Sequence, residues 1–426
     1  MALDSAVGSF DITTGASDVV ISTLSFQPKV IIFFWNGRTG SADAVGGADL
    51  HSGFGFTTGV SNNRSCAMNS DDGNTVQDAN SVCADNACIV DIDFTPAIVG
   101  RASLKSFDSG GFTLQIDDAF PTNYRIGYMA LGGSDLTDAR VGSYNEPGAT
   151  GNQSQSGFGF QPDIVCFIHA QESTAVNTPS AGGGLGMGWA KSSTNRWVWN
   201  GFSEHTGATS ADTQTNCQAV EVINMQSSTA GLAVTGRAEF VSMDSGGFTI
   251  NWLERISTRQ CFYLAIRAPG CSFIGDFVTS VTLDADIVES GFGFQPNAVL
   301  CVSACKVATA SNAAAADNEL SIGAFTSTSN RLAFGHTDDD AAGTMVCGTA
   351  VEFDSVYVAL TQVDATTVEG LVDVQSIDSD GFTLNQDDAD AVAAFVGYVA
   401  FGTPAAPPPW DVSFGHTMMN LTGVGH

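Results

Sequence analysis

The residues best suited to bind a ligand lie around one predicted strand in the middle of the chain, NRWVWN. Trp197 and Trp199 alternate along this strand and therefore share one face, and Trp189 lies just upstream. Facing outward, these rings would form an aromatic platform for a sugar or a protein partner. Facing inward, they would be core. Both placements are open at this point.

Glu204 and His205 follow on the adjoining turn, where they could act as an acid and a base. We match His205 to His336 of the later segment FGHTDD. Neither a nucleophile nor a second positioned carboxylate accompanies the pair, and the chain lacks H-E-x-x-H, G-x-S-x-G, Walker and C-x-x-C motifs. We therefore expect a protein without enzymatic activity, with Trp189, Trp197, Trp199, Glu204 and His205 as candidate ligand-binding residues.

The thiol and acid pairs predict neither a metal site nor a cofactor. Cys83 and Cys88, like Cys301 and Cys305, lack the further Cys or His that would complete a zinc shell. The acid pairs in QIDDAF and NQDDAD could bind a hard cation, but the corresponding middle segment is NWLERI, so solvated loops are the better reading. Cysteines inside apolar runs are expected to be buried and reduced.

Three copies of one unit must position these residues. The segments FQPKVIIFFW, FQPDIVCFIH and FQPNAVLCVS place Pro28, Pro162 and Pro296 at a constant spacing of 134 residues. Proline fixes φ and lacks a donor, so each FQP indicates a turn or strand entry, and the apolar run after it predicts a strand buried on both faces.

Two further motif sets recur in the same order. SFDSGGFTLQ, SMDSGGFTIN and SIDSDGFTLN are typical of a hairpin turn followed by a strand, and they contain Phe112, Phe248 and Phe382.

Three Asn-Arg pairs between strands form the other set, which contains Arg64, Arg196 and Arg331. We expect each arginine to form an ion pair with an acid of its own copy, and all these residues to be structural anchors.

The fold predicted from this pattern is all-β. Abundant glycine (47 residues), few charged residues (14%) and frequent turns favour short antiparallel strands. We expect three tandem β-sandwich domains of jelly-roll or lectin-like type and a Pro-rich tail. Their predicted bounds are 1–136, 137–270, 271–403 and 404–426. The tail could dock on its own domains or reach a neighbouring subunit.

The formal charge of −30 disfavours direct binding to nucleic acid or anionic membranes. The middle copy is nearly neutral and contains four of the six tryptophans. The N-terminal residues do not have the pattern of a secretory signal, and no apolar run is long enough to span a bilayer. We expect synthesis in the cytoplasm.

Repeats with a GFQPD-type strand, a DGFTL strand and a closing Y-x-A-x-G strand resemble units of tailed-bacteriophage virion proteins, such as tail fibres, spikes and head appendages. The resemblance covers nearly the whole chain, but its motifs are those of turns and strands. It implies a virion structural protein that decorates the capsid or forms a tail appendage, with a possible role in host attachment. It also implies other virion proteins as partners and a homo-oligomer, conceivably a trimer. The alternative is a carbohydrate-binding array with its glycan site in the Trp-rich middle copy.

Overall fold

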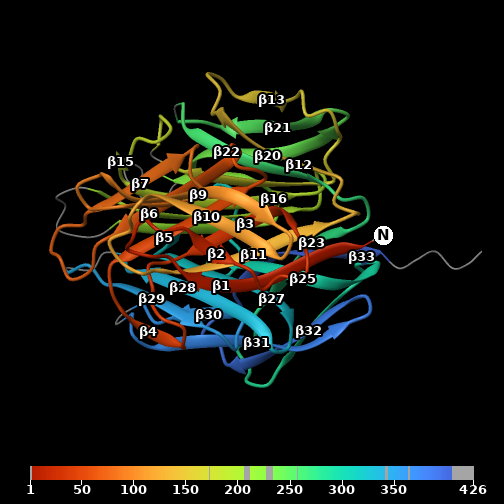
Figure 1. The fold of residues 1–426 in the computed structure, drawn as a ribbon. Helices are drawn as coiled ribbons and strands as arrows, with labels where there is room; N and C mark the ends of the chain where they lie inside the picture. The colour runs from red at the N-terminus through yellow and green to blue at the C-terminus, as the bar shows by residue number, and fades with distance from the viewer. Residues whose placement is uncertain are drawn as a thin grey trace, which may run out of the picture.

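The computed structural model describes residues 2–171, 173–205, 212–226, 234–256, 258–340, 344–362 and 365–404. Their regular secondary structure consists of strands in six antiparallel sheets (Figure 1). This confirms the predicted all-β fold. The described residues include no helix long and apolar enough to cross a membrane. The tail predicted for 404–426 lies, apart from Pro404, outside the described residues.

The same sheet pair occurs three times, a seven-stranded sheet covered by a four-stranded one. The first pair is β1 (Leu3–Asp11), β11 (Arg125–Gly133), β3 (Pro28–Trp35), β5 (Leu50–Thr57), β6 (Asn63–Ser70), β7 (Ala79–Ala84) and β15 (Ser180–Ala181), with β2 (Val19–Ile21), β10 (Gly111–Asp118), β9 (Ile98–Asp108) and β8 (Ile89–Ile92). The second is β12 (Asp138–Asn145), β22 (Gln260–Arg267), β14 (Ile164–Ala170), β16 (Gly183–Ala190), β17 (Arg196–Ser203), β18 (Thr213–Gln218) and β26 (Ala315–Ala316), with β13 (Gly151–Gln155), β21 (Gly247–Glu254), β20 (Val234–Asp244) and β19 (Ile223–Gln226). The third is β23 (Ser272–Val278), β33 (Phe395–Pro404), β25 (Phe294–Ser303), β27 (Asn318–Ser327), β28 (Asn330–Asp338), β29 (Cys347–Glu352) and β4 (Ala44–Gly47), with β24 (Asp286–Ser290), β32 (Gly381–Asp388), β31 (Val368–Asp378) and β30 (Tyr357–Leu360).

The strand after each FQP is buried on both faces because it lies between two hydrophobic cores. In β3, Ile31 and Phe33 belong to the core of the first sandwich. Their neighbours Ile32 and Phe34 face the opposite way, into a core at the centre of the molecule. This double burial explains why the sequence shows a continuous apolar run here instead of an alternating one.

The central core joins all three copies. It is one cluster built from the inner faces of the three seven-stranded sheets. Phe34 of the first copy meets Phe334 of the third edge-on, with 5.6 Å between ring centroids, and Phe54 meets Trp199 of the second at 5.7 Å. The four-stranded sheets lie outside and close three separate sandwich cores.

Each seven-stranded sheet also takes its last strand from another copy. The second copy supplies β15 to pair with β7, the third supplies β26 to pair with β18, and the first supplies β4 to pair with β29. In Figure 1, β4 lies next to β29, far from its sequence neighbours. The three copies therefore form a closed ring with shared sheets, which three tandem domains in a row would not.

The DSGGF and DSDGF turns are held by the same two hydrogen bonds in every copy. Ser106 and Thr113 donate to the Asp108 carboxylate at 2.8 Å each. The same Ser and Thr positions donate to Asp244 and Asp378 at 2.7 to 2.9 Å. The aspartates thus hold the hairpin together.

The phenylalanine of each turn motif is fully buried against a tyrosine of the closing strand. Phe112 and Tyr128 are in edge-to-face contact, with 5.3 Å between ring centroids. The corresponding pairs, each at 5.2 Å, are Phe248 with Tyr263 and Phe382 with Tyr398.

The FQP segments are structural as well. Pro28, Pro162 and Pro296 are buried within two residues of the start of their strands. The glutamine before each proline donates to a main-chain carbonyl just ahead of the hairpin turn, as Gln27 does to Phe107 at 2.7 Å. Gln161 and Gln295 make the corresponding bonds at 2.8 and 3.2 Å. The motif therefore ties the large sheet of each copy to its small sheet.

Two of the three anchor arginines pair with an acid of their own copy. Arg196 Nη2 lies 3.4 Å from the Glu239 carboxylate, and Arg331 forms an ion pair with Asp373. Arg196 and Arg331 also donate to main-chain carbonyls, which joins the large sheet to the small one.

For Arg64 the prediction is wrong. In the first copy the arginine lies one residue closer to the core-facing positions of its strand than it does in the second. Cys66 and Trp199 both face the central core, but Cys66 comes two residues after Arg64 and Trp199 three after Arg196. Strand alternation therefore turns Arg64 toward the second copy. There its guanidinium carbon lies 5.5 Å from the ring centroid of Phe262.

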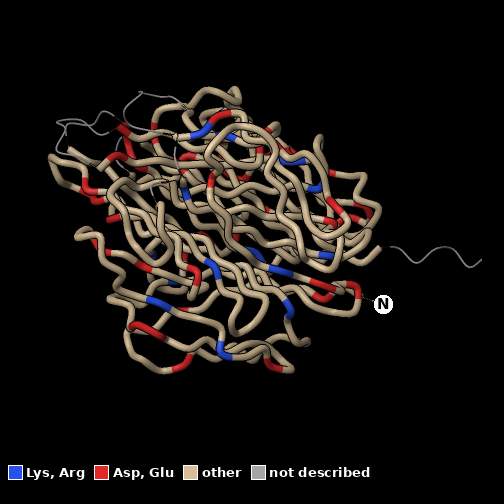
Figure 2. The backbone as a smooth tube through the Cα atoms, turned by 90° about the horizontal axis from the view of Figure 1, so that it is seen from above, with Lys and Arg blue, Asp and Glu red and all other residues tan. Residues whose placement is uncertain are grey.

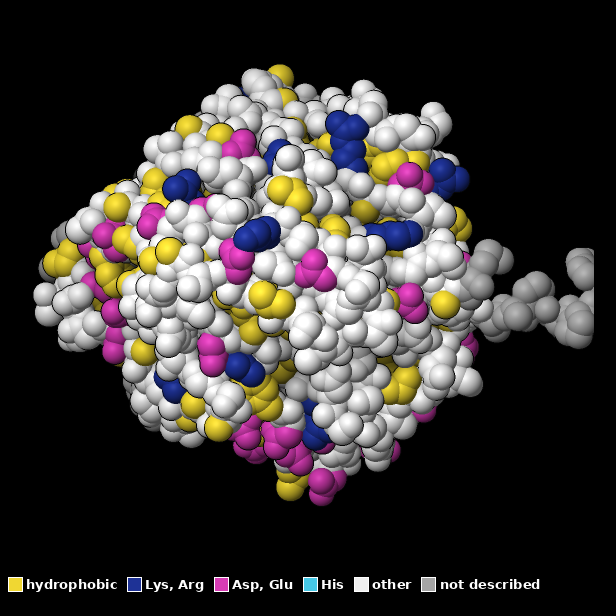
Figure 3. Space-filling view, in the orientation of Figure 1, with side chains coloured by type: hydrophobic (Ala, Val, Ile, Leu, Met, Phe, Trp, Pro, Cys, Tyr) yellow, Lys and Arg dark blue, Asp and Glu magenta, His cyan; other side chains and the backbone are white. Residues whose placement is uncertain are grey.

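Acidic residues are spread along the backbone and outnumber Lys and Arg, 45 to 15 in the sequence (Figure 2). On the face seen in Figure 3, acidic, basic and hydrophobic side chains are intermixed.

Candidate functional site

The three candidate tryptophans are core residues. Trp189, Trp197 and Trp199 are at most 1% exposed and belong to the central cluster. The indole N–H of Trp197 donates to the carbonyl of Tyr398 at 3.0 Å, and that of Trp199 donates to Glu319 at 2.9 Å. The outward-facing aromatic platform is therefore wrong, since these rings join the second copy to the third.

His205 and Glu204 lie at the surface, as expected of a turn. His205 Nδ1 is 2.8 Å from the carboxylate of Asp78, which the first copy supplies. The side chains of His205 and Asp78 are each about one-third exposed. A pocket of about 330 Å³ opens beside them; its lining residues are Asp71, Asn74, Thr75, Val76, Gln77, Asp78 and His205. Among the described residues, the lining contains no Phe, Tyr or Trp side chain to stack on a sugar.

His336 is not the counterpart of His205. His336 lies five residues after Arg331, and the residue five after Arg196 is Gly201. His336 is 1% exposed in β28, whereas His205 lies beyond the end of β17. The similarity of the two short segments therefore does not reflect equivalent positions.

A chain of buried polar side chains runs inward from this pocket and joins all three copies. Gln77 of the first copy donates to Asp338 of the third at 3.2 Å. Ser203 of the second copy donates to the same carboxylate oxygen at 2.5 Å. Asn318 in turn donates to Ser203 at 2.9 Å. Because the Asp338 carboxylate of the third copy accepts hydrogen bonds from the first and second copies, it fixes how their sheets meet.

The inner end of this chain is a serine and histidine pair. Ser52 Oγ lies 2.8 Å from His336 Nδ1, and His336 Nε2 lies 3.3 Å from Asn318 Oδ1. Such a pair can activate a nucleophile when substrate reaches it. Ser52 is fully buried and His336 is 1% exposed, so the arrangement serves packing instead.

Burial also perturbs the ionisation of this chain. It lowers the pKa of His336 to about 3, so this ring is neutral at pH 7. It raises the pKa of Asp338 to about 6, although Ser203 and other donors oppose the rise. Both shifts arise because the interior disfavours the charged form of each group.

The interior of the second sandwich contains polar residues that sequence analysis missed. His169, Asn200, Asn216 and Asn224 are at most 1% exposed there. The corresponding positions in the third copy hold small or apolar side chains, among them Ala350. Asn200 in WVWNG was the available signal, because it interrupts an apolar run.

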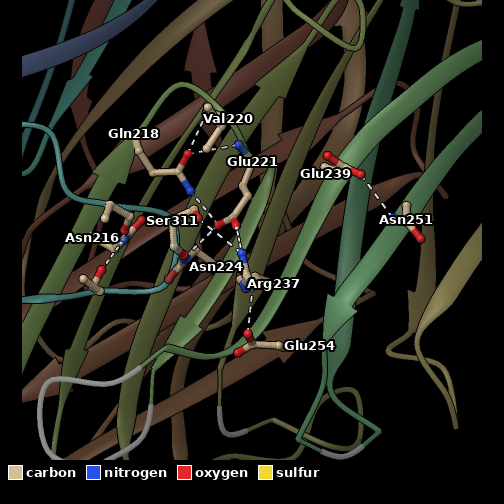
Figure 4. Close-up of polar contacts among 12 residues, drawn as sticks. Asn216, Gln218, Val220, Glu221, Asn224, Arg237, Glu239, Asn251, Glu254 and Ser311 are labelled. Carbon is tan, nitrogen blue, oxygen red and sulfur yellow. Dashed lines mark hydrogen bonds and ion pairs between the residues drawn. The ribbon is translucent and has the colours of Figure 1, made fainter.

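Where β26 of the third copy approaches the second copy, a charged network links them (Figure 4). Arg237 binds Glu221 at 3.1 Å and Glu254 at 2.8 Å, and it donates to Ser311 of the third copy at 3.2 Å. Asn224 completes the contact by donating to Glu221 at 2.9 Å. Burial raises the pKa of Glu221, against the effect of these donors.

The equivalent junction between the second and first copies is simpler and has a single carboxylate. Asn177 Nδ2 donates to the Asp85 carboxylate at 2.6 Å, and the Asp85 main-chain N–H donates back to Asn177 Oδ1 at 3.2 Å.

The third junction, between the first and third copies, consists of carboxylates. Asp43, Glu352 and Asp354 have ligand oxygens within 4.8 Å of one another, and they are the one group among the described residues that could share a metal ion. Burial and the two neighbouring carboxylates raise the pKa of Glu352 to about 7. Sequence analysis missed this group because Asp43 and Glu352 come from opposite ends of the chain.

All ten cysteines are buried and unpaired by disulfides, in agreement with the prediction. Cys66 and Cys83 are cross-strand neighbours with 3.2 Å between their sulfur atoms. Burial raises the pKa of Cys66 above its usual range, so it remains a thiol.

No protein-family model matches the chain, and no curated protein matches it in sequence.

Proposed function

We propose that the chain is a non-enzymatic structural protein of a tailed-bacteriophage virion, either decorating the capsid or forming a tail appendage. The observation that carries this proposal is the closed ring of three copies, built by the exchange of β4, β15 and β26. A single chain of this kind presents three related faces around one axis. Such a surface suits attachment to a threefold or pseudo-threefold site in a symmetric particle.

Two further features support a structural role over a catalytic one. Ser52, His336 and Asp338 are buried in the contacts between copies. The acidic exterior suits a protein that must stay soluble until it assembles. A contribution to host attachment is part of the proposal, but the buried tryptophans argue against the middle copy as a glycan-binding module.

The proposal is tested on purified particles from the source of the sequence. Mass spectrometry of the particles should detect this chain, and negative-stain imaging with an antibody against the full chain should label either the head or the tail. Label on the head indicates decoration, and label on the tail indicates an appendage. Particles that contain neither peptide nor label would overturn the virion assignment.

A further inference from the structure

The three junctions of the ring occupy equivalent places, yet in only two of them do described residues pair the carboxylates with donors. In each, the segment that leads to an exchanged strand meets the end of the neighbouring sheet. The first is satisfied by the hydrogen bonds of Asn177 and Asp85. The second is satisfied by Arg237 between two glutamates. The third brings three carboxylates together.

Within the third junction, Glu352 is the buried member. It is 8% exposed, and no described N–H, O–H or cationic group binds its carboxylate. Asp43 comes from the segment leading to β4 and is oriented by the main-chain N–H of Phe353, which donates to it at 2.7 Å. This bond points the Asp43 carboxylate toward Glu352 and Asp354, within the 4.8 Å that separates the ligand oxygens.

Two arginines that contact Asp354 and Phe353 do not neutralise the group. Arg331 pairs with Asp373 and donates to the main-chain carbonyl of Asp354, not to its carboxylate. Arg125 pairs with Asp11, and its guanidinium lies over the Phe353 ring. An unpaired buried carboxylate beside two others costs free energy unless a cation joins them.

We propose that Asp43, Glu352 and Asp354 bind a Ca²⁺ ion that closes the ring between the first and third copies. Three carboxylates without nitrogen or sulfur donors favour a hard cation over zinc, whose structural sites are built from Cys and His. Asp43 and Asp354 are exposed, so the ion can enter from solvent and keep water as its remaining ligands. This junction is the one that no chain connection reinforces, since the first and third copies are not consecutive.

The test measures calcium binding to the full chain by isothermal titration after chelator treatment. The Glu352→Gln variant keeps the side-chain shape and removes the charge. Its matched control is Asp85→Asn, which removes one acid at the equivalent, hydrogen-bonded junction. Other acidic loops could also take up calcium, so the informative quantity is the number of bound ions.

We expect Glu352→Gln to bind one Ca²⁺ fewer than the wild type, or to bind it at least tenfold more weakly, while Asp85→Asn keeps the full number. Calcium should raise the melting temperature of the wild type and of Asp85→Asn, but not that of Glu352→Gln. A second variant, Asp43→Asn, should behave like Glu352→Gln. Agreement between the two variants shows that misfolding of one of them is not the cause of the lost calcium. Equal calcium stoichiometry and affinity in the wild type and both site variants overturns the proposal, as does a wild type that binds no calcium.

Discussion

At the scale of single residues, the aromatic side chains that look like a binding surface are the ones that hold the copies together. Trp197 is 1% exposed, its ring lies against the main chain of Gly397, and its N–H bonds the carbonyl of Tyr398. Replacing it leaves a cavity between the second and third copies and removes a hydrogen bond that joins them.

Trp197→Ala should therefore lower the free energy of unfolding by about 3 to 5 kcal/mol. The measurement is urea unfolding followed by circular dichroism. Val220→Ala is the control, because Val220 is 51% exposed and its truncation should change stability by less than about 0.5 kcal/mol. A Trp197→Ala protein as stable as the wild type would contradict the shared core and restore the exposed platform.

The buried carboxylate of Asp338 predicts a pH dependence. Its pKa in the folded protein is raised to about 6 from 3.8, so the folded state holds its proton more tightly than the unfolded state does. Stability from this group is present below pH 3.8 and is lost as the pH rises through 6. The free energy of unfolding of Asp338→Asn, relative to that of the wild type, should therefore rise by about 2 to 3 kcal/mol from pH 4 to pH 7.

Denaturant unfolding of both proteins at several pH values measures this difference. A constant difference over the whole range would show that Asp338 is not held in a charge-excluding environment.

At the scale of elements, the two glycines of each DSGGF turn differ in what surrounds them. A β-carbon on Gly247 would collide with the main-chain carbonyl of Gln155 in β13, whereas one on Gly246 meets nothing within 4 Å. The same collision occurs at Gly111 and Gly381, against Ile21 and Glu289. The second glycine therefore lets the edge strand of the small sheet approach.

Gly247→Ala should destabilise the protein by about 1 to 3 kcal/mol, because the edge strand must move. Gly246→Ala, one residue away, should leave stability within about 1 kcal/mol of the wild type or raise it slightly. Thermal melting of the two variants side by side distinguishes them. Equal losses would contradict a specific requirement for glycine at Gly247.

At the scale of the whole molecule, the copies share too much to be independent. The inner face of each seven-stranded sheet packs only against those of the other two copies, and each sheet needs a strand from another copy. Separating a copy exposes this apolar face and an unpaired strand edge.

Residues 137–270 expressed alone should therefore fail to form a stable monomer. We expect aggregation, self-association or a broad, weakly cooperative melt, whereas the full chain should unfold in one transition. Light scattering and calorimetry on the two proteins provide the comparison. A monomeric fragment with a sharp transition would show that the central core adds little to each copy.

Much of the fold was predictable because its signals are local. The FQP runs, the DSGGF turns and the constant 134-residue spacing follow from the φ restriction of proline, the turn chemistry of Asp and Gly, and strand alternation. The candidate site was less predictable. A run of apolar residues shows that a strand is buried, but not which of two cores each residue enters, so Trp197 and Arg64 were open to misplacement.

The sequence by itself determined that this protein is all-β, is built from three copies, and carries Phe112, Phe248 and Phe382 in equivalent cores. Only the tertiary structure decided that the copies close into a ring, that His205 meets Asp78, and that Asp43 meets Glu352. The physical reason is that local patterns encode whether a residue is buried or exposed. Which residues meet across 300 positions of chain depends on how three sheets pack around one core, and no local pattern records that.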